Sequence, residues 1–410
     1  MKLLVYEYVS GGGYQRKDIP PSVLCEGFAM LRSVASDFKA SGHEVHILLD
    51  CRVSKLSPPL EVNCVKHIFY PQEAENSLIY SSKIYDGIYI IAPETGQTLQ
   101  SLVKIAEQAG ALSLNCESNA IQRVADKTNL YASLKNSGLL TPKTLFFVVG
   151  SDLTEVNHAI KSQLCYPVVF KPSDGVSCGG LSLVKEEQQI GKAMAKIKTV
   201  SAAEEFVVQE FVGGEAVSVS LLCAGGEALA ISLNKQNIHL ATPDSASNYK
   251  GGAVPFNHPL RHVAFKAAEN AVKSFHGLRG YVGVDLVLAP DKPYVVDINA
   301  RLTTSYVGLS RVAGFNIAEA MVKAVAESKL PTEKKMRGCI IFSKVETPKP
   351  TLDAFQKAAQ ISEVVSPPFI LKGTTKACTL IVGEGESSED AQLRLEEAKK
   401  RLLTIISRGK

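Results

Sequence analysis

The sequence predicts an α/β protein that begins with an open parallel sheet and continues into parts of mixed α+β architecture. Two observations indicate this. Up to about residue 115, short apolar runs alternate with helical patterns, which is typical of a parallel sheet covered by helices. Beyond residue 120, apolar runs follow one another through glycine turns, as antiparallel strands do. The length of 410 residues, at roughly 150 residues per domain, predicts two or three domains.

The alternation in the first part indicates where functional loops lie. Open parallel sheets bind ligands at the carboxyl ends of their strands. Glu7 and Glu94 follow two of the expected strands, so both are candidate site residues, with a structural loop acid as the alternative. The expected strands are 3–6, 45–49, 85–92 and 111–115, and the expected helices are 23–38 and 99–109.

The second part is built from glycine-linked strands, and a small α+β tail follows it. Gly213-Gly214 and Gly225-Gly226 predict two successive hairpins. The tail combines a strand with an amphipathic helix whose apolar residues recur at 3-4-3 spacing, Leu395, Ala398, Leu402 and Ile405. The expected helices are 120–123 and 126–136, and the expected strands are 168–171, 206–210, 216–223, 228–233, 284–288, 294–298 and 378–382.

Composition excludes several classes of function. A net charge of +4 is too small to indicate a nucleic-acid partner. No apolar run approaches the roughly 20 residues of a membrane-spanning helix. The apolar start of the chain reads as a strand rather than a signal peptide, so we expect a cytoplasmic protein. Nine cysteines without any C-x-x-C pair indicate reduced thiols rather than a disulfide framework or a zinc site.

Two facing strands carry the strongest site signal. Asp297 and Asn299 are two residues apart and project from one face of a strand, and Asp285 on the partner strand can face them. Two carboxylates and an amide supply the hard oxygen ligands that Mg²⁺ or Mn²⁺ prefers. Arg301, two residues further on, adds a planar cation that can bind an anion. The alternative is a sheet whose polar face meets water.

A lysine followed by a glycine-rich loop carries the second signal. Lys171 ends an expected strand, and the loop 174–180 follows it. Backbone N–H groups of such a loop, together with the lysine, can bind phosphate oxygens. The loop lacks the Gly-Lys-[Ser/Thr] sequence of a Walker A motif. Lys127, at the head of an expected helix, is a second candidate. An ordinary hairpin and a solvated surface lysine are the alternatives.

The strand 206–210 and the turn after it carry the third signal. An apolar strand that ends in a polar pair can serve as a nucleotide hinge, where backbone groups near Phe211 and Val212 read the adenine edge. The carboxylate of Glu215 can bind ribose hydroxyls. The alternative is a hairpin with solvated acids.

The order and spacing of these motifs resemble the ATP-grasp superfamily over roughly residues 115–325. The resemblance implies Mg²⁺ or Mn²⁺, with two ions expected, on Asp285, Asp297 and Asn299. The superfamily more often has Glu at the position of Asp297. The implied ATP-binding residues are Lys127, Lys171, Ser177, Gly179, Gly180, Gln209, Glu210, Phe211, Val212 and Glu215.

The resemblance also implies a domain order. We expect a preceding α/β domain at 1–119 and an ATP-grasp domain at 120–330, followed by an α+β extension at 331–410. Within the ATP-grasp domain, 120–205 is expected to carry the lid, and 206–330 to bind metal and substrate.

Further local features resemble the tyramine–glutamate ligase family of methanofuran biosynthesis. They run from the first residues to about 325 and include Tyr6-Glu7-Tyr8, Ala92-Pro93-Glu94, Ser177-Cys178-Gly179-Gly180, Ser232-Leu233-Asn234-Lys235-Gln236 and Arg301-Leu302-Thr303-Thr304-Ser305-Tyr306. The resemblance implies a ligase that joins a carboxylate to an amine through an acyl phosphate and releases ADP and phosphate.

The chemistry assigns roles to these residues. Lys171 and Arg301 are the expected catalytic residues, because they offset charge on the transferring phosphoryl group. Arg301, Thr303 and Thr304 are candidates for binding the acceptor carboxylate, and Glu7 and Glu94 for holding the amine.

Other functions stay open. One is a different ATP-grasp enzyme, such as a peptide ligase or a carboxylase-like enzyme, and another is a nucleotide-binding protein without activity. We expect small-molecule substrates and neither nucleic acid nor membrane as partners. Superfamily relatives are often dimers, so a homodimer is open as well.

Overall fold

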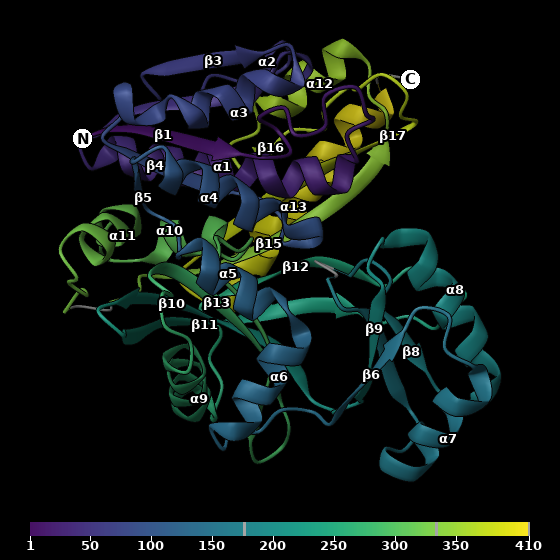
Figure 1. Cartoon of the computed structure of the whole chain (residues 1–410). Coiled ribbons are helices and arrows are strands. Elements are labelled where there is room, and N and C mark those ends of the chain that lie inside the picture. The colour runs from purple at the N-terminus through teal and green to yellow at the C-terminus, as the bar shows by residue number, and fades with distance from the viewer. Residues whose placement is uncertain (175–177, 333–334, 409–410) are drawn as a thin grey trace.

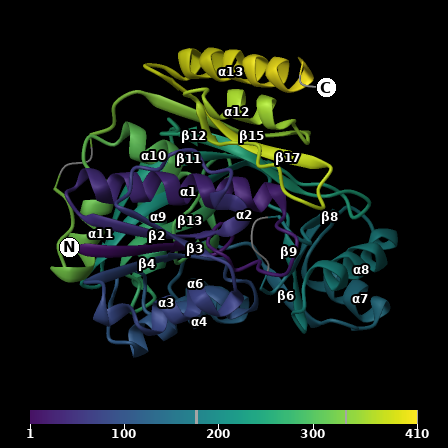
Figure 2. The ribbon, with the colours of Figure 1, turned by 90° about the horizontal axis from the view of Figure 1, so that it is seen from above.

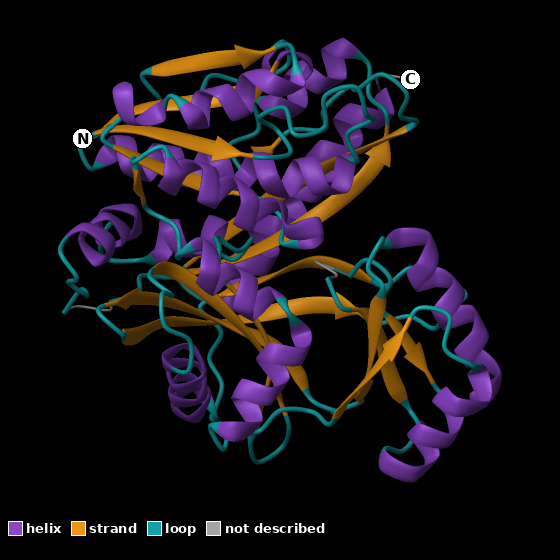
Figure 3. Cartoon of the chain, in the orientation of Figure 1, coloured by secondary structure: helices purple, strands orange, loops and turns teal. Residues whose placement is uncertain are grey.

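The computed structural model describes residues 1–174, 178–332 and 335–408. The described chain forms three sheets, and helices pack on their faces (Figure 1, Figure 3). Among the described residues, none of the helices has the length and apolar character needed to span a membrane.

The N-terminal sheet is parallel, as the sequence predicts. Its order is β3-β2-β1-β4-β5, which places β1 at the centre and makes its carboxyl end a loop at the middle of the sheet edge. The short strand β3 and helix α3 were not expected from the sequence. The strands are β1 (Lys2–Glu7), β2 (Glu44–Asp50), β3 (Cys64–Ile68), β4 (Gly87–Ile91) and β5 (Leu112–Ser113). The helices are α1 (Pro21–Ala40), α2 (Cys51–Ser54), α3 (Pro71–Ile79) and α4 (Thr98–Gln108), with single 3₁₀ turns η1 (Ser81–Lys83) and η2 (Thr95–Gln97).

A small antiparallel sheet of order β6-β9-β7-β8 has its own core. Phe170 and Phe206 stack inside it at 5.8 Å between ring centroids. Two helices, α5 (Ser118–Ala125) and α6 (Lys127–Asn136), precede it in the chain. The sheet contains β6 (Thr144–Val148), β7 (Val168–Pro172), β8 (Ser182–Val184) and β9 (Glu205–Glu210), with α7 (Leu153–Gln163), η3 (Glu187–Gln189) and α8 (Ile190–Val200) on one side.

A large antiparallel sheet of order β14-β13-β10-β11-β12-β15-β17-β16 forms the middle of the molecule. Its strands are β10 (Glu215–Ala224), β11 (Glu227–His239), β12 (Asn248–Val254), β13 (Gly280–Leu288), β14 (Pro293–Asn299), β15 (Cys339–Pro348), β16 (Val364–Ser366) and β17 (Lys376–Gly385). Its helices are α9 (Arg261–Lys273), α10 (Tyr306–Val312), α11 (Ile317–Ala326), α12 (Leu352–Ala359) and α13 (Ser388–Arg408).

One of the two expected hairpins is wrong. Strands β10 and β11 do form a hairpin through Gly225 and Gly226, both at positive φ. Strand β9, however, pairs with β6 and β7 in the small sheet, whereas β10 lies in the large one. The segment 211–214 therefore crosses between two sheets. Gly214 is required there, because a Cβ would lie 2.2 Å from the carbonyl oxygen of Leu288.

The C-terminal strands continue the large sheet. Strand β15 pairs with β12, and β17 pairs with β15, so residues 339–385 share a sheet with residues 215–299. Figure 2 shows α13 on the outer face of this end. After Leu402, the next buried residue on the apolar face of α13 is Ile406, not the expected Ile405, because an undistorted helix returns to one face after four residues as readily as after three. The domain boundary expected near residue 330 stays a prediction.

Candidate active site

Two adjoining cavities, of about 200 Å³ and about 400 Å³, lie where the three sheets meet. The smaller cavity lies toward the N-terminal sheet, and the larger one toward the small antiparallel sheet. Six residues line both cavities and form a shared wall: Lys127, Cys178, Gln236, Ile238, Asp285 and Asp297. The two expected metal ligands in this wall are therefore accessible from both sides.

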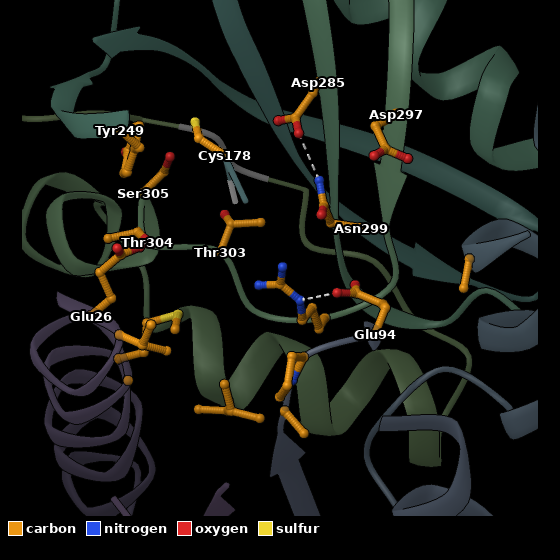
Figure 4. A pocket seen from close by; sticks show the side chains of 18 of the residues that line it. Glu26, Glu94, Cys178, Tyr249, Asp285, Asp297, Asn299, Thr303, Thr304 and Ser305 are labelled. Carbon is orange, nitrogen blue, oxygen red and sulfur yellow. Dashed lines mark hydrogen bonds and ion pairs between the residues drawn. The ribbon is translucent and has the colours of Figure 1, made fainter. Parts of the chain in front are cut away.

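Strands β13 and β14 present the acidic part of this wall as the sequence predicts. Asp285 lies opposite Asp297, and Asn299 is on the same face, opposite Gly283. The Asn299 Nδ2 donates to Asp285 Oδ2 over 2.9 Å (Figure 4). Gln236, on β11, donates its Nε2 to the other oxygen of Asp285 over 2.9 Å. The Asp285 carboxylate is thus fixed by two amides.

A lysine that is distant in the sequence but adjacent in space balances the charge of these carboxylates. Burial, and next the charge of Asp297, raises the pKa of Asp285 to about 6. The Lys127 Nζ lies 2.6 Å from both carboxylate oxygens of Asp297. The ammonium group of Lys127 therefore lies between the two carboxylate oxygens of Asp297, at a position that suits a cation.

The donor set fits a hard divalent cation. Asp285 and Asp297 offer carboxylate oxygens, and Asn299 keeps its carbonyl oxygen free of the bond that its amide makes to Asp285. These are the ligand types that Mg²⁺ and Mn²⁺ take, usually together with water and phosphate oxygens. Within the described ranges, no three His, Cys, Asp or Glu side chains form a preorganised metal site. A cation held here would thus need ligands from a bound molecule.

Lys171 lies in the larger cavity at the end of β7. Its Nζ donates to Gln209 Oε1 over 3.2 Å, and Gln209 in turn donates to Thr144 Oγ1 over 2.9 Å. Burial lowers the pKa of Lys171 to about 8, although the nearby carboxylates oppose this shift. A lysine whose charge is this poorly solvated gains strongly from an anionic ligand.

Apolar side chains line most of the larger cavity, which suits a planar ring. The expected hinge residues Gln209, Glu210, Phe211 and Val212 are in its wall. The Glu210 carboxylate accepts the N–H of Lys143 over 3.1 Å, so it connects the hinge to the residue that precedes β6. The apolar lining is completed by Pro142, Val169, Pro172, Leu181, Ala216, Leu240, Leu286, Val287 and Val296.

The remaining expected ATP-binding residues differ in position. Gly179 lines the larger cavity, and Gly180 follows at φ +73°, packed near Pro172 and Val200. Glu215 is exposed and does not belong to the lining of either cavity. Ser177 lies outside the described residues.

Arg301 and Glu94 form a buried ion pair in the smaller cavity. The Arg301 Nε donates to Glu94 Oε2 over 2.7 Å (Figure 4). The Arg301 Nη1 donates to the carbonyl oxygen of Leu302. The other Glu94 oxygen is buried and has no hydrogen-bond partner among the described residues. The pair connects β14 to the loop after β4, so the two residues, expected to bind different substrates, contact each other.

Glu7 lines the smaller cavity, but its own loop occupies its carboxylate. Val9 N–H donates to Oε1 over 3.0 Å, and both the N–H and the hydroxyl of Ser10 donate to Oε2. Burial raises the pKa of Glu7. This geometry matches the structural alternative stated for Glu7, and its contact with an amine stays a prediction.

The sequence reasoning missed five residues of the site: Glu26, Cys178, Gln236, Tyr249 and Lys344. Four of them line the cavities, and Lys344 reaches the carboxylate of Glu26 over 2.5 Å. They lie on α1, β11, β12, β15 and the loop after β7. Two of them stand in segments that the sequence analysis quoted, Cys178 in the loop 174–180 and Gln236 in the motif 232–236. No sequence signal pointed to the other three.

The fold and the site define a class of protein. The family model of the ATP-grasp domain matches residues 124–305, and the model of the pre-ATP-grasp domain matches residues 43–121. Carboxyaminoimidazole ribonucleotide synthase from Aspergillus clavatus, solved in complex with ATP, shares the fold with a TM-score of 0.68 and 15% identity, over 100% of this chain and 99% of that one.

The curated relatives are more specific. Tyramine–L-glutamate ligase of Methanocaldococcus jannaschii is 30% identical over 81% of this chain and 92% of the relative. Its counterpart in Methanocaldococcus fervens is 34% identical over 60% of this chain and 68% of the relative. The chain belongs to the ATP-grasp superfamily and, within it, to the family of these ligases. It is a carbon–nitrogen bond-forming ligase, as the sequence predicts.

Proposed function

We propose that this ligase joins a carboxylate of L-glutamate to the amine of tyramine and converts ATP to ADP and phosphate. The observation that carries the proposal is the wall shared by the two cavities, with Lys127, Asp285 and Asp297. It separates a mostly apolar cavity from a more polar one, so the phosphate end of a nucleotide in the first can meet a carboxylate in the second. The likeness to tyramine–L-glutamate ligases supports both substrates.

ATP occupies the larger cavity in this proposal. The adenine ring lies among the apolar side chains and contacts the hinge 209–212. The phosphates extend toward Lys171 and Lys127. Because both lysines contact protein groups in this structure, Gln209 and Asp297, they exchange those partners for phosphate oxygens. Lys127 thereby frees the carboxylate of Asp297.

Asp285, Asp297 and Asn299 are the residues that would hold Mg²⁺ or Mn²⁺, as one ion or two. Such an ion, when bound, supplies charge neutralisation for the phosphate oxygens. The protein contributes the fixed orientation of the Asp285 carboxylate, which the amides of Asn299 and Gln236 hold from both sides.

The acid substrate occupies the smaller cavity. A carboxylate cannot be attacked directly by an amine in water, since its leaving group would be oxide. Transfer of the γ-phosphoryl group of ATP to the carboxylate oxygen makes an acyl phosphate and releases ADP. The amine then attacks the acyl carbon, and phosphate leaves with the acyl C–O bond electrons. Arg301, held by Glu94, orients the carboxylate and offsets the charge that develops.

The lining of the smaller cavity supports an amine with an aromatic body. Its polar centre is bordered by Val9, Val23, Met30, Ile238 and Tyr249. Val23 and Ile238 are 43% and 39% exposed, so they offer apolar surface that a ligand with an apolar body can cover. A phenylethylamine would bury this surface, whereas ammonia would not.

A substrate-pair assay tests the proposal. ADP and phosphate release is measured with L-glutamate and tyramine, each alone and together, and with other amino acids and amines in their place. We expect release in a 1:1 ratio with amide formation, only with both substrates present. Formation of AMP, or turnover with bicarbonate in place of glutamate, contradicts the proposal.

A further inference from the structure

A buried ion pair at the far end of the smaller cavity comes from opposite ends of the chain. Glu26 lies on α1 and Lys344 on β15, and their side chains are 13% and 12% exposed. Lys344 Nζ donates to Glu26 Oε1 over 2.5 Å and to Ser22 Oγ over 3.0 Å. It also lies 5.7 Å from the ring centre of Tyr249.

Glu26 presents a fixed carboxylate to the cavity. Its Oε1 accepts from Lys344, and its Oε2 accepts from the Thr304 hydroxyl over 2.9 Å. A carboxylate has about four acceptor positions in all, so roughly two stay free for a ligand. Glu26 lines the cavity, whereas Lys344 stands behind it. A ligand therefore meets the anion of this pair, not the cation.

The position of Glu26 decides which ligand group it meets. Figure 4 shows the metal-binding side chains Asp285 and Asn299 at one end of the pocket, Thr303 between, and Glu26 with Thr304 at the other end. In the proposed reaction, the carboxylate that is phosphorylated lies at the first end. The remainder of the acid substrate extends toward Glu26.

We propose that Glu26 binds the ammonium group that an amino-acid substrate keeps through the reaction, and that Lys344 is the positioning residue for Glu26. This inference rests on the proposed function only in taking an amino acid as the carboxylate substrate. Amide formation at a carboxylate leaves the amino group of the same molecule unreacted, so that group stays charged and needs a fixed counter-ion in a buried site.

The reacting amine is a poorer ligand for Glu26. An amine must be uncharged to attack, and a neighbouring carboxylate stabilises its charged form and so raises its pKa. Glu26 is also poorly placed to act as a base, because each of its oxygens already accepts a hydrogen bond, Oε1 from Lys344 and Oε2 from Thr304. Its geometry suits binding rather than proton transfer.

The test compares amino acids with their des-amino analogues. Wild-type protein receives Mg–ATP, hydroxylamine as the nucleophile, and one acid from the pairs L-glutamate and glutarate, L-aspartate and succinate, or L-alanine and propionate. Hydroxylamine converts an acyl phosphate to a hydroxamate, so the readout does not depend on the amine. We expect kcat/KM for an amino acid to exceed that of its analogue by roughly 10- to 100-fold, the value of one charged hydrogen bond.

The variants then assign this preference to Glu26. We expect E26Q to lose most of it by raising KM for the amino acid, while kcat/KM for the analogue stays near the wild-type value. We expect K344M to lose part of it, also through KM. The matched control is K376M, which removes the exposed Lys376–Glu346 pair from the same sheet and leaves the preference unchanged. Thermal unfolding and ATP binding confirm that each variant is folded.

Three results would overturn the inference: equal use of both members of every pair, no hydroxamate from any amino acid, or a full preference retained in E26Q. If E26Q is unfolded, K344M provides the test, with the same ratio of kcat/KM for the amino acid to kcat/KM for its analogue. If hydroxamate forms with amino acids but no amide forms with tyramine, the proposed amine is wrong and the role of Glu26 is unaffected.

Discussion

Asp285 is one of the six residues that line both cavities, and its neighbours fix the orientation of its carboxylate. Two amides, from Asn299 and Gln236, donate to its two oxygens, and Asp297 lies opposite on the next strand. A buried carboxylate beside another carboxylate is unfavourable without a cation. The site is therefore complete only when positive charge is present, and in this structure Lys127 supplies it.

Replacing Asp285 with Asn tests this role. The amide keeps the size of the carboxylate but loses its charge, so we expect ADP release to fall roughly 100- to 1,000-fold, as when a preorganised charge-stabilising group is removed. The free energy of unfolding should change by no more than about 1–3 kcal/mol, because one of the two amide donors loses its acceptor oxygen. Steady-state kinetics and urea unfolding measure the two effects. E346Q, at an exposed position of β15, is the control, and a D285N protein with wild-type kcat would contradict the assignment.

Gly27 determines where Glu7 lies. A Cβ at this position would fall 2.5 Å from Glu7 Oε1, inside the network that orders the loop after β1. We expect G27A to destabilise the protein by about 1–3 kcal/mol through overpacking and to weaken substrate binding.

Gly191 provides the matched control for this substitution. It also lies in a helix, α8, but within the described part of the chain its added Cβ would meet Leu153 alone, at an ordinary 3.6 Å. We expect G191A to stabilise the protein by about 0.5–1 kcal/mol, because alanine loses less backbone entropy than glycine on folding. Urea unfolding of both variants measures the difference, and equal effects at the two positions would contradict it.

At the scale of elements, helix α1 connects the N-terminal sheet to the large one. Its Asp37 Oδ2 accepts the Tyr306 hydroxyl of α10 over 2.6 Å, and Asn316 donates to the Asp37 carbonyl oxygen. The same helix provides Arg32, which donates to two carbonyl oxygens near β16, and Glu26 in the pocket. One helix thus fixes the substrate pocket to three other elements.

The contact between α1 and α10 predicts a pH-dependent stability. Burial raises the pKa of Asp37 from 3.8 to about 7, although Tyr306 and Arg311 oppose the shift. The folded state binds this proton more tightly than the unfolded chain does. The stability that the protonated Asp37 contributes is therefore complete below pH 4 and is lost as the pH rises to about 7. The upper bound of this loss is about 4 kcal/mol.

The variant D37N removes this titration. We expect its Tm to fall less than that of the wild type between pH 5 and pH 8, because the amide stays neutral and still accepts the Tyr306 hydroxyl. Differential scanning calorimetry at the two pH values measures the change. D353N, on the exposed face of α12, should retain the wild-type difference, and a D37N protein that does so as well would contradict the assignment.

Local periodicity determines how much of the site the sequence could predict. Asp297 and Asn299 had to share a face because side chains alternate along a strand, and Asp285 was close enough in sequence for a hairpin to bring it opposite. The same reasoning failed for β9 and β10, since glycines mark a turn but do not show whether the next strand stays in the same sheet. Glu26 and Lys344 meet across 318 residues, and no local pattern encodes such a contact.

At the scale of the whole molecule, the chain ends support each other. Phe28 of α1 packs edge-on against Phe369, with ring centroids 4.9 Å apart. Both belong to one core that also contains Ile340 and Phe342 of β15. The fold therefore depends on contacts between the first helix and the last strands of the chain.

This closure predicts the effect of truncation. A chain that ends at Arg337 lacks β15, β16 and β17, exposes the edge of β12, and uncovers the apolar face of α1. Unpaired strand edges and large apolar faces promote aggregation, so we expect this chain to aggregate or to unfold without a cooperative transition. Size-exclusion chromatography and thermal unfolding test this, with a chain that lacks only residues 409–410 as the control. A monomeric truncated chain with wild-type Tm and Mg–ATP binding would show that the C-terminal strands are dispensable, and the role of Lys344 in the pocket would then lose its structural basis.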